Sequence, residues 1–316
     1  MRFLIVGTGG VGGYFGAKLA HAGNDVWFMA RGGHLAAMKA SGLRVRSTGG
    51  EFLIPPGKMT DSPEEAGPVD VVLFCVKTYD TEEAARSLAP ALHRRSLAVS
   101  LQNGVENEAK IRRLIPHARV DGGVAYVSAR VTAPGEITES GGFQRIVFGP
   151  TDGPIDERDR EVHRLLVEAG IKCDLREKIV NDLWNKFVFI TSMGSFAAMS
   201  RLTQGEILAQ PETISLVFRA MHEVEALAWK RGVDIEPLNE GKMLANLKRF
   251  HPDSRSSLYY DLAGQKPLEI EALNGTVVRL GKELGVPTPI HSVIYAALLP
   301  YHLKHLQLRD IARSAS

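Results

Sequence analysis

The feature that most constrains this chain is a glycine cluster between a predicted strand and a predicted helix at its N-terminal end. Residues 3–6 are an apolar run typical of a buried strand, and residues 14–20 continue as an amphipathic helix. The glycines between them match G-x-G-x-x-G, which allows a tight turn, close approach of the main chain to a pyrophosphate, and close strand–helix packing. Free N–H groups at the helix N-terminus attract phosphate. We therefore predict a dinucleotide site at Gly7, Thr8, Gly9, Gly10, Val11 and Gly12. The alternative is a glycine-rich turn without a ligand.

The end of the second predicted strand, residues 25–30, indicates which dinucleotide binds. An NAD site commonly has a carboxylate there to hold the ribose 2′-hydroxyl. The only acid in this segment, Asp25, lies at the start of the strand, and Arg31 follows its end. A guanidinium can pair with a 2′-phosphate through two hydrogen bonds. The pattern favours NADP(H), and the alternative is that Arg31 is a solvated loop residue.

The order of predicted elements divides the chain in two. Strands alternate with helices in the first half, and residues 69–76 are apolar enough for a strand buried on both faces. From about residue 177 only helices are expected, with one helix over residues 179–200. The predicted fold class is α/β, with an N-terminal Rossmann-type doubly wound sheet over residues 1–176 and an all-helical C-terminal domain over residues 177–316. In such a fold the active site is expected between the domains, at the carboxyl ends of the strands.

Composition excludes several classes of function. The chain has 38 Lys and Arg residues against 36 Asp and Glu residues, a net charge of +2, so no nucleic-acid partner is expected. Residues 284–303 contain no Lys, Arg, Asp or Glu, but three prolines make this stretch a poor membrane span. Two cysteines, Cys75 and Cys173, form no disulfide framework and no metal-ligand spacing. We expect a cytoplasmic protein without a metal site or membrane contact.

Polar side chains follow two of the predicted strands. Lys77 comes directly after the apolar run of residues 69–76, and Asn103 follows the strand predicted at residues 97–101. Both fall where this fold class binds ligands, so Lys77 could hold a phosphate or carboxylate and Asn103 a ribose or substrate. The alternatives are a solvated strand end for Lys77 and a turn residue before Gly104 for Asn103.

A lysine in an apolar helix is the candidate for proton transfer. Lys186 precedes four apolar residues, and no other charge occurs before Arg201. Burial lowers the pKa of a lysine toward the range that suits proton transfer. When a hydride reduces a ketone, an ammonium group can stabilise and protonate the developing alkoxide. The alternative is a lysine that extends from the helix end into solvent.

Taken together, these residues resemble the ketopantoate reductases (2-dehydropantoate 2-reductases) over nearly the whole chain. Six segments occur in the family's order and approximate spacing: GTGGVGGYFGAKLA, RGGHLAAMKASGLRV, VKTYDT, LQNGVEN, LWNKF and SSLYYDLAGQKPLEIEALNG. The resemblance implies NADPH-dependent reduction of 2-dehydropantoate to (R)-pantoate in pantothenate biosynthesis. It also implies a Rossmann domain followed by a helical substrate domain.

The resemblance also implies roles for individual residues. Arg31 matches the arginine that binds the 2′-phosphate, residues 7–12 match the pyrophosphate loop, and Lys186 matches the proton donor. The remaining matches are polar contacts to cofactor or substrate: Lys77 and Asn103 for both, Ser128 and Glu269 for the cofactor, and Ser257 for the substrate.

Two positions depart from the family's pattern. Asparagines are usual four and eight residues after the lysine, but this chain has Ile190 and Gly194 there. Thr191, Ser192 and Ser195 are near, yet an offset of one residue turns a helical side chain by about 100°, so they do not simply replace the amides. We therefore expect a pocket for a larger or less polar 2-oxo acid.

Three functions stay open at this point. The first is an NADPH-dependent 2-oxo acid reductase of the ketopantoate type, and the second is a related reductase or dehydrogenase with another substrate. The third is an NADPH-binding sensor without activity, which would have no use for a lysine among aromatic residues. The expected partner is a small 2-oxo acid. The long apolar helices of the second half are compatible with a homodimer and equally with a monomer.

Overall fold

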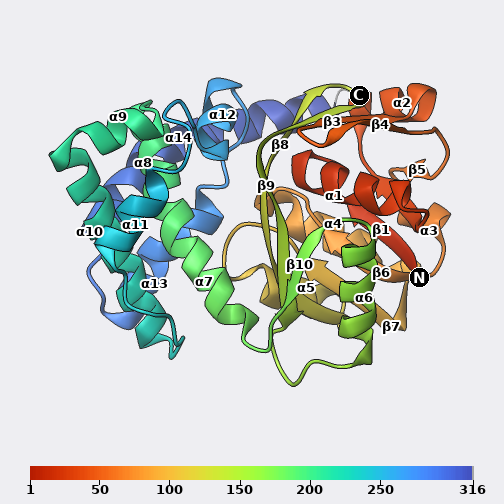
Figure 1. Cartoon of the computed structure of the whole chain (residues 1–316), viewed down its shortest axis with the longest axis horizontal. Coiled ribbons are helices and arrows are strands. Elements are labelled where there is room, and N and C mark those ends of the chain that lie inside the picture. The colour runs from red at the N-terminus through yellow and green to blue at the C-terminus, as the bar shows by residue number, and fades with distance from the viewer. Residues whose placement is uncertain (315–316) are drawn as a thin grey trace. The chain divides into compact units, whose positions relative to one another are not determined.

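The computed structural model describes residues 1–314 and divides them into two compact units. The first unit is Met1–Leu183 and the second begins at Trp184. The boundary expected from the sequence, after residue 176, precedes helix α7 (Ile179–Phe189), whereas the division by contacts falls within that helix. The elements of each unit are labelled in Figure 1.

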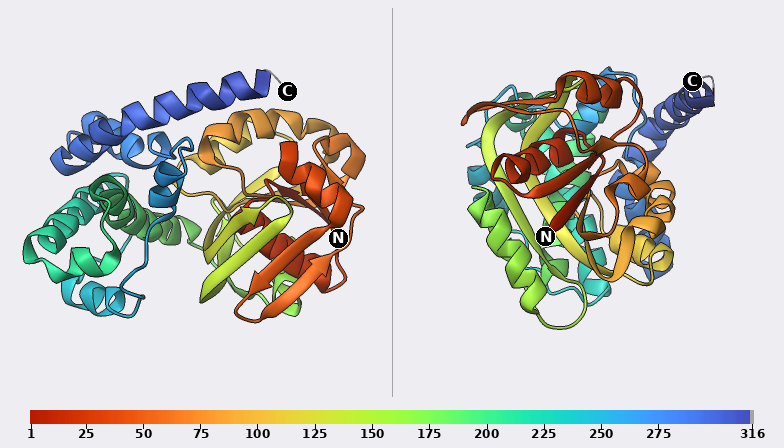
Figure 2. Two further views of the ribbon diagram at one scale, coloured as in Figure 1. Left: turned by 90° about the horizontal axis from the view of Figure 1, so that it is seen from above. Right: turned by 90° about the vertical axis from the view of Figure 1, so that its right-hand side faces the viewer.

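The first unit is a ten-stranded sheet covered by helices, shown from two further sides in Figure 2. Its strands are β1 (Arg2–Val6), β2 (Asp25–Met29), β3 (Leu43–Ser47), β4 (Gly50–Ile54), β5 (Met59–Thr60), β6 (Val69–Phe74), β7 (Leu92–Ser100), β8 (Arg119–Ala133), β9 (Glu136–Pro150) and β10 (Lys172–Leu175). Its helices are α1 (Gly10–His21), α2 (Gly32–Ser41), α3 (Pro63–Ala66), α4 (Thr81–Ser87), α5 (Asn107–Leu114) and α6 (Glu157–Glu168), with the 3₁₀ turns η1 (Thr78–Asp80) and η2 (Ala89–Ala91).

The strand order places four strand ends side by side. The order is β4-β3-β9-β8-β7-β6-β1-β2-β5, with β10 paired to β9. From β5 to β8 all neighbours are parallel, and the chain reverses its winding direction between β1 and β6. Such a switch point opens a crevice at the carboxyl ends of the strands, where doubly wound folds bind ligands.

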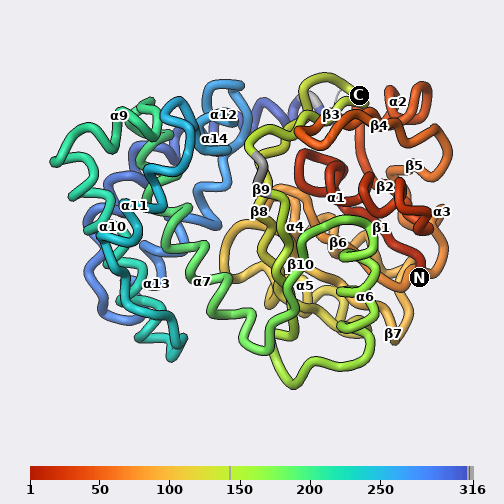
Figure 3. The backbone as a smooth tube through the Cα atoms, viewed as in Figure 1, coloured from red at the N-terminus to blue at the C-terminus, as the bar shows by residue number. Residues whose placement is uncertain are grey.

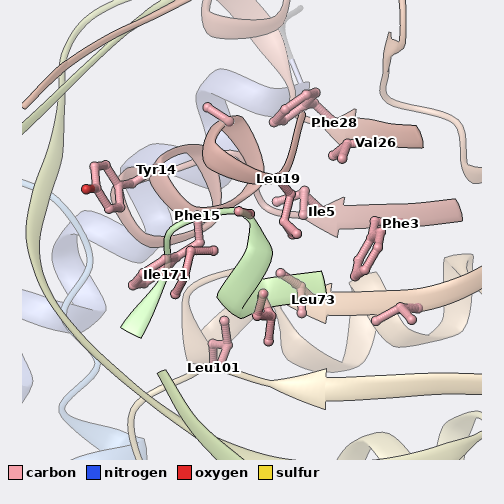
Figure 4. Close-up of a cluster of buried hydrophobic side chains, with 14 of the residues drawn as sticks. Phe3, Ile5, Tyr14, Phe15, Leu19, Val26, Phe28, Leu73, Leu101 and Ile171 are labelled. Carbon is pink, nitrogen blue, oxygen red and sulfur yellow. The ribbon is translucent and has the colours of Figure 1, made fainter. Parts of the chain in front are cut away.

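Hydrophobic side chains cover both faces of this sheet. On one face, Phe15 and Leu19 of α1 pack with Ile5, Phe28 and Leu73 of the strands, as Figure 4 shows. A second buried cluster on the other face joins strand residues to small and branched residues of α3, α4 and α5. Helices therefore bury the strands from both sides, and the prediction of a doubly wound α/β sheet is confirmed.

Strands β8 and β9 correct one expectation. The sequence pattern predicts short strands at residues 119–125, 135–139 and 144–148, with a turn at residues 141–142 between the last two. Instead, β8 and β9 each run for 15 residues and pair antiparallel. Gly141 lies inside β9 with φ of +109°, and the β8–β9 register shifts between Val127 and Ala129. A glycine within a strand permits such an irregularity without ending the strand.

The second unit contains helices and no strand over residues 184–314. After the end of α7 they are α8 (Ser195–Ser200), α9 (Gln204–Ala209), α10 (Pro211–Lys230), α11 (Glu240–Leu247), α12 (Ser257–Ala263), α13 (Thr276–Leu284) and α14 (Pro289–Ser314). The prediction of an all-helical second half is confirmed. Figure 3 follows the backbone through these turns.

Two π-helical turns interrupt the predicted helices of this unit. The single helix expected over residues 179–200 is divided by η3 (Ile190–Gly194), and η4 (Glu271–Gly275) precedes α13. A π turn closes i→i+5 hydrogen bonds and so contains one more residue than an α-helical turn, which rotates the side chains that follow it. The expectation of one regular helix is therefore wrong at residues 190–194.

Candidate active site

The glycine loop has the geometry that a pyrophosphate site requires. Gly7 has φ of +96°, and a Cβ there would lie 2.7 Å from the Val76 nitrogen. A Cβ on Gly12 would overlap the carbonyl oxygen of Gly7, so this glycine allows the helix to pack on the strand. Gly9 has open space on its Cβ side. The three glycines thus provide the turn, the packing and the open approach that a dinucleotide needs.

Strand β8 lies directly against the start of α1. A Cβ on Gly10 would overlap the main-chain carbonyl of Ala129. Ser128, the residue before Ala129, is exposed beside this contact. The structure therefore brings Ser128 close to the glycine loop, although the two are far apart in the sequence.

Two polar side chains hold the loop in place. The Thr8 hydroxyl, a predicted cofactor contact, donates to the carbonyl of Met29 at 2.9 Å. This hydrogen bond connects the glycine loop to the end of β2. His34 accepts at Nδ1 from the Gly135 N–H at 3.0 Å, which leaves Nε2 to donate to the Thr8 carbonyl at 2.9 Å. Burial lowers the pKa of His34, consistent with this neutral imidazole. Nothing in the local sequence around His34 indicates this role.

Arg31 follows β2 at the start of α2 and pairs with Glu83 of α4 at 2.7 Å. Both side chains are solvent-accessible, 41% and 57% respectively, and such an exposed ion pair contributes little stability. A bound phosphate could therefore take the place of Glu83. Asp25, at the other end of β2, is bonded to Arg2 and Lys58.

Lys77 and Asn103 occupy equivalent positions after neighbouring strands. Phe74 of β6 is in register with Ser100 of β7, and each candidate follows its strand end by three residues. Gln102 connects the two loops because its amide donates to the carbonyl of Val76 at 2.9 Å. Both candidates thus lie at strand ends as predicted, and Gln102, which was not predicted, connects their loops.

In sheet order, the ends of β2, β1, β6 and β7 therefore present Arg31, the glycine loop, Lys77 and Asn103 in succession. These residues all lie at the carboxyl ends of the strands. Ser128 lies at the same end of the sheet, because its neighbour Ala129 contacts Gly10.

Lys186 lies on α7 in an apolar environment within the second unit. It is half-buried between buried neighbours on its own helix, Trp184 and Phe187, whose rings pack edge to face. Burial lowers the pKa of Lys186 to about 8, and the negative charge of Glu269 opposes this shift. Glu269 is itself buried, 5% exposed. The second unit thus brings together the two ionisable residues that the sequence separates by 83 positions.

The helix that follows Lys186 presents few polar groups. Ile190 and Gly194 are partly accessible, and a Cβ on Gly194 would make ordinary contact with the Ser256 Cβ at 3.6 Å. Ser256 caps α12 and donates to the carbonyl of Gly194 at 2.8 Å. Ser257, the predicted substrate contact, is exposed at the first position of α12.

Neither a metal centre nor a membrane span is formed by the described part of the chain. Among residues 1–314, no three His, Cys, Asp or Glu side chains are grouped so as to hold a metal ion. No helix within those residues has both the length and the apolar character needed to cross a membrane.

Comparisons with known proteins agree with this arrangement. The family model described as ketopantoate reductase PanE/ApbA matches residues 3–153, and the model of the C-terminal part of the same family matches residues 178–302. The chain belongs to the ketopantoate reductase family. An uncharacterized oxidoreductase YkpB of Bacillus subtilis is 27% identical over 95% of this chain and 99% of its own length. A 2-dehydropantoate 2-reductase of Mesorhizobium japonicum is 30% identical over 94% of this chain and 96% of its own.

A solved structure shows the same fold. The PanE/ApbA family ketopantoate reductase of Ralstonia eutropha superposes with a TM-score of 0.88 at 30% identity, covering 97% of this chain and all of that one. The chain is therefore an oxidoreductase of this family, with NADP(H) as its cofactor.

Proposed function

We propose that this protein converts 2-dehydropantoate to (R)-pantoate, with Lys186 as the proton donor. The observation that carries the proposal is the half-buried ammonium of Lys186, with its pKa lowered to about 8 beside the buried carboxylate of Glu269. A general acid works best when its pKa lies near the working pH. The proposed setting is pantothenate biosynthesis in the cytoplasm.

The residues of the first unit fit an NADP(H) molecule. The open side of Gly9 and the N-terminus of α1 would receive the pyrophosphate, and Arg31 would bind the 2′-phosphate in place of Glu83. Lys77, Asn103 and Ser128 would add polar contacts at the same sheet edge. When bound, the cofactor supplies a hydride to the carbonyl carbon of the substrate.

The chain then has to stabilise and protonate the resulting alkoxide. The ammonium of Lys186 donates a proton from Nζ to the oxygen, and the neutral amine regains a proton from solvent. Glu269 favours the charged form of Lys186 and so keeps the donor protonated at neutral pH. Ser257 at the start of α12 is the proposed contact for the substrate's polar groups.

A second candidate substrate is a bulkier or less polar 2-oxo acid. It is favoured by Ile190 and Gly194, which follow Lys186 at one and two helical turns and offer a branched apolar side chain and a position without a side chain. A hydroxyl-rich substrate would find no amide at these positions.

The test is NADPH oxidation with a panel of 2-oxo acids, comparing the wild type with Lys186→Ala. We expect kcat to fall by about 10²- to 10⁴-fold, the usual contribution of a general acid, while NADPH binding measured by fluorescence persists. Unchanged turnover would remove Lys186 from the mechanism.

The same panel decides between the substrates and the non-catalytic alternative. Preference for 2-dehydropantoate over aromatic or long-chain analogues supports the first candidate, and the reverse preference supports the second. Tight NADPH binding without turnover of any 2-oxo acid would instead indicate a sensor.

A further inference from the structure

Each ionisable residue of the second unit's candidate site is followed closely by a π turn. η3 begins four residues after Lys186, and η4 begins two residues after Glu269. The two π turns contact each other. π turns are rare and occur frequently at functional sites, where the extra residue changes the direction of the side chains that follow.

One buried side chain bonds the two turns together. Asn274 of η4 is completely buried, and its Nδ2 donates to the main-chain carbonyl of Thr191 in η3 at 3.1 Å. Its Oδ1 accepts from the hydroxyl of Ser195, the residue directly after η3, at 2.6 Å. The amide therefore uses both of its ends on the helix that carries Lys186.

The buried residue Thr191 holds η3 through its hydroxyl and its carbonyl. The hydroxyl of Thr191 donates to the carbonyl of Phe187 at 2.7 Å and so bonds within its own helix, whereas its carbonyl accepts from Asn274 of η4. A side chain that bonds into the helical hydrogen-bond ladder is a known cause of local distortion. A substitution at position 274 would leave a buried carbonyl and a buried hydroxyl without this partner.

We propose that Asn274 is a positioning residue that sets the placement of Lys186 relative to Glu269 by bonding η3 to η4. The inference rests on the proposed function only in treating Lys186 as the proton donor. An asparagine is required because one end of the side chain must donate and the other must accept. Aspartate would place an oxygen against the carbonyl of Thr191, and leucine would fill the volume but form neither bond.

The test measures the titration of Lys186 directly, by NMR of the full chain labelled with ¹³C-lysine. The Lys186 resonance is assigned by its absence from Lys186→Arg. In Asn274→Ala we expect Lys186 to titrate at higher pH than in the wild type, because separation of the two turns admits water. Burial affects the pKa of this group more than the charge of Glu269 does, so hydration outweighs the loss of that charge. We also expect kcat to fall by about 10- to 100-fold, the cost of misplacing a catalytic group by about 1 Å.

Matched variants separate positioning from a general loss of stability. Thr203→Ala removes a buried helix cap elsewhere in the same unit, where the threonine hydroxyl accepts from the Glu206 N–H. It should lower the melting temperature without moving the Lys186 titration. An Asn274→Ala protein that melts earlier but keeps the wild-type titration and kcat would overturn the proposal.

A variant with a smaller change covers the case in which Asn274→Ala does not fold. Ser195→Ala removes only the bond to Oδ1, and it should shift the Lys186 titration in the same direction by a smaller amount. No shift in this variant would overturn the proposal. If Lys186→Ala keeps full turnover while the titration shift is present, the proton-donor role fails and the positioning inference stands.

Discussion

The two units hold their candidate residues by different physical means. In the first, Arg31, Lys77 and Asn103 follow strands whose register is fixed by main-chain hydrogen bonds. In the second, Lys186 lies on α7 and Glu269 in the bend before η4, and side-chain bonds of Asn274 connect the two π turns that follow them. The first unit should therefore be sensitive to steric change and the second to the loss of individual polar groups.

The largest expected effect compares a glycine of each unit. Gly10→Ala places a methyl group against the main-chain carbonyl of Ala129, whereas Gly194→Ala places one at ordinary contact distance from Ser256. We expect the first change to lower the free energy of unfolding by about 1–3 kcal/mol or more and to abolish NADPH binding. The second should be neutral or stabilising by up to about 1 kcal/mol. Denaturant unfolding and NADPH titration would measure both, and equal losses would contradict the comparison.

A buried carboxyl of the first unit should affect stability rather than chemistry. Burial raises the pKa of Glu108 to about 7, against opposing effects of its own N–H, Ser100 and Arg112. The folded pKa exceeds the unfolded one, so the stabilisation is complete below about pH 4.5 and is lost as pH rises through about 7. Glu108→Gln should therefore raise the free energy of unfolding by about 2–3 kcal/mol at pH 8 and little at pH 5.

The control for Glu108→Gln is Glu82→Gln, which changes an exposed glutamate of the same unit. Its unfolding curves at pH 5 and pH 8 should match those of the wild type. The idea of a buried neutral carboxyl fails if Glu108→Gln is no more stable than the wild type at pH 8.

Arg31 tests how the first unit selects its cofactor. Arg31→Gln should weaken NADPH binding by about 10- to 100-fold, since hydrogen bonds to a charged group contribute about 1.5–3 kcal/mol. NADH binding should change little, because NADH has no 2′-phosphate. Glu83→Gln removes the ion-pair partner of Arg31 and should therefore strengthen NADPH binding slightly. If Arg31→Gln weakens the binding of NADPH and NADH equally, Arg31 does not contact the 2′-phosphate.

The smallest expected effect concerns the pH dependence set by the second unit. Reduction needs protonated Lys186, so kcat should decline as pH rises through about 8. The charge of Glu269 raises the pKa of Lys186, and Glu269→Gln should therefore move this decline to lower pH. Glu271→Gln, an exposed neighbour bonded to Tyr295, is the matched control. If kcat declines at the same pH in Glu269→Gln as in the wild type, Glu269 does not influence the titration of Lys186.

Local patterns predicted the first unit well because each signal lies within a few residues. Gly7, Gly9 and Gly12 adopt the three geometries expected from their spacing, and Lys77 and Asn103 fall at neighbouring strand ends. The pair between Arg31 and Glu83 was not predicted, since nothing in a single sequence relates residues on separate elements. The length of β9 was missed because Gly141 resembles a turn residue but lies inside the strand.

The second unit was predicted only in outline. Apolar periodicity located its helices, yet the residues of η3 and η4 are compatible with an ordinary α-helix, so the two π turns were not expected. Thr191 and Ser195, which were not expected to replace the missing amides, are both fully buried and bonded to other protein groups. Asn274 lies in the last of the six segments that resemble the family, but the sequence does not indicate its partners, which lie about 80 positions away.

The contact between Gly10 and the Ala129 carbonyl also limits how the glycine fingerprint can be transplanted. Side-chain collisions can be relieved by a smaller residue at the second position, but a main-chain carbonyl is present whatever residue stands at 129. No second-site substitution there can accommodate a larger residue at position 10. A chimera that borrows the N-terminal strand, loop and helix must therefore also borrow the path of β8, so the fingerprint is one part of a two-segment module.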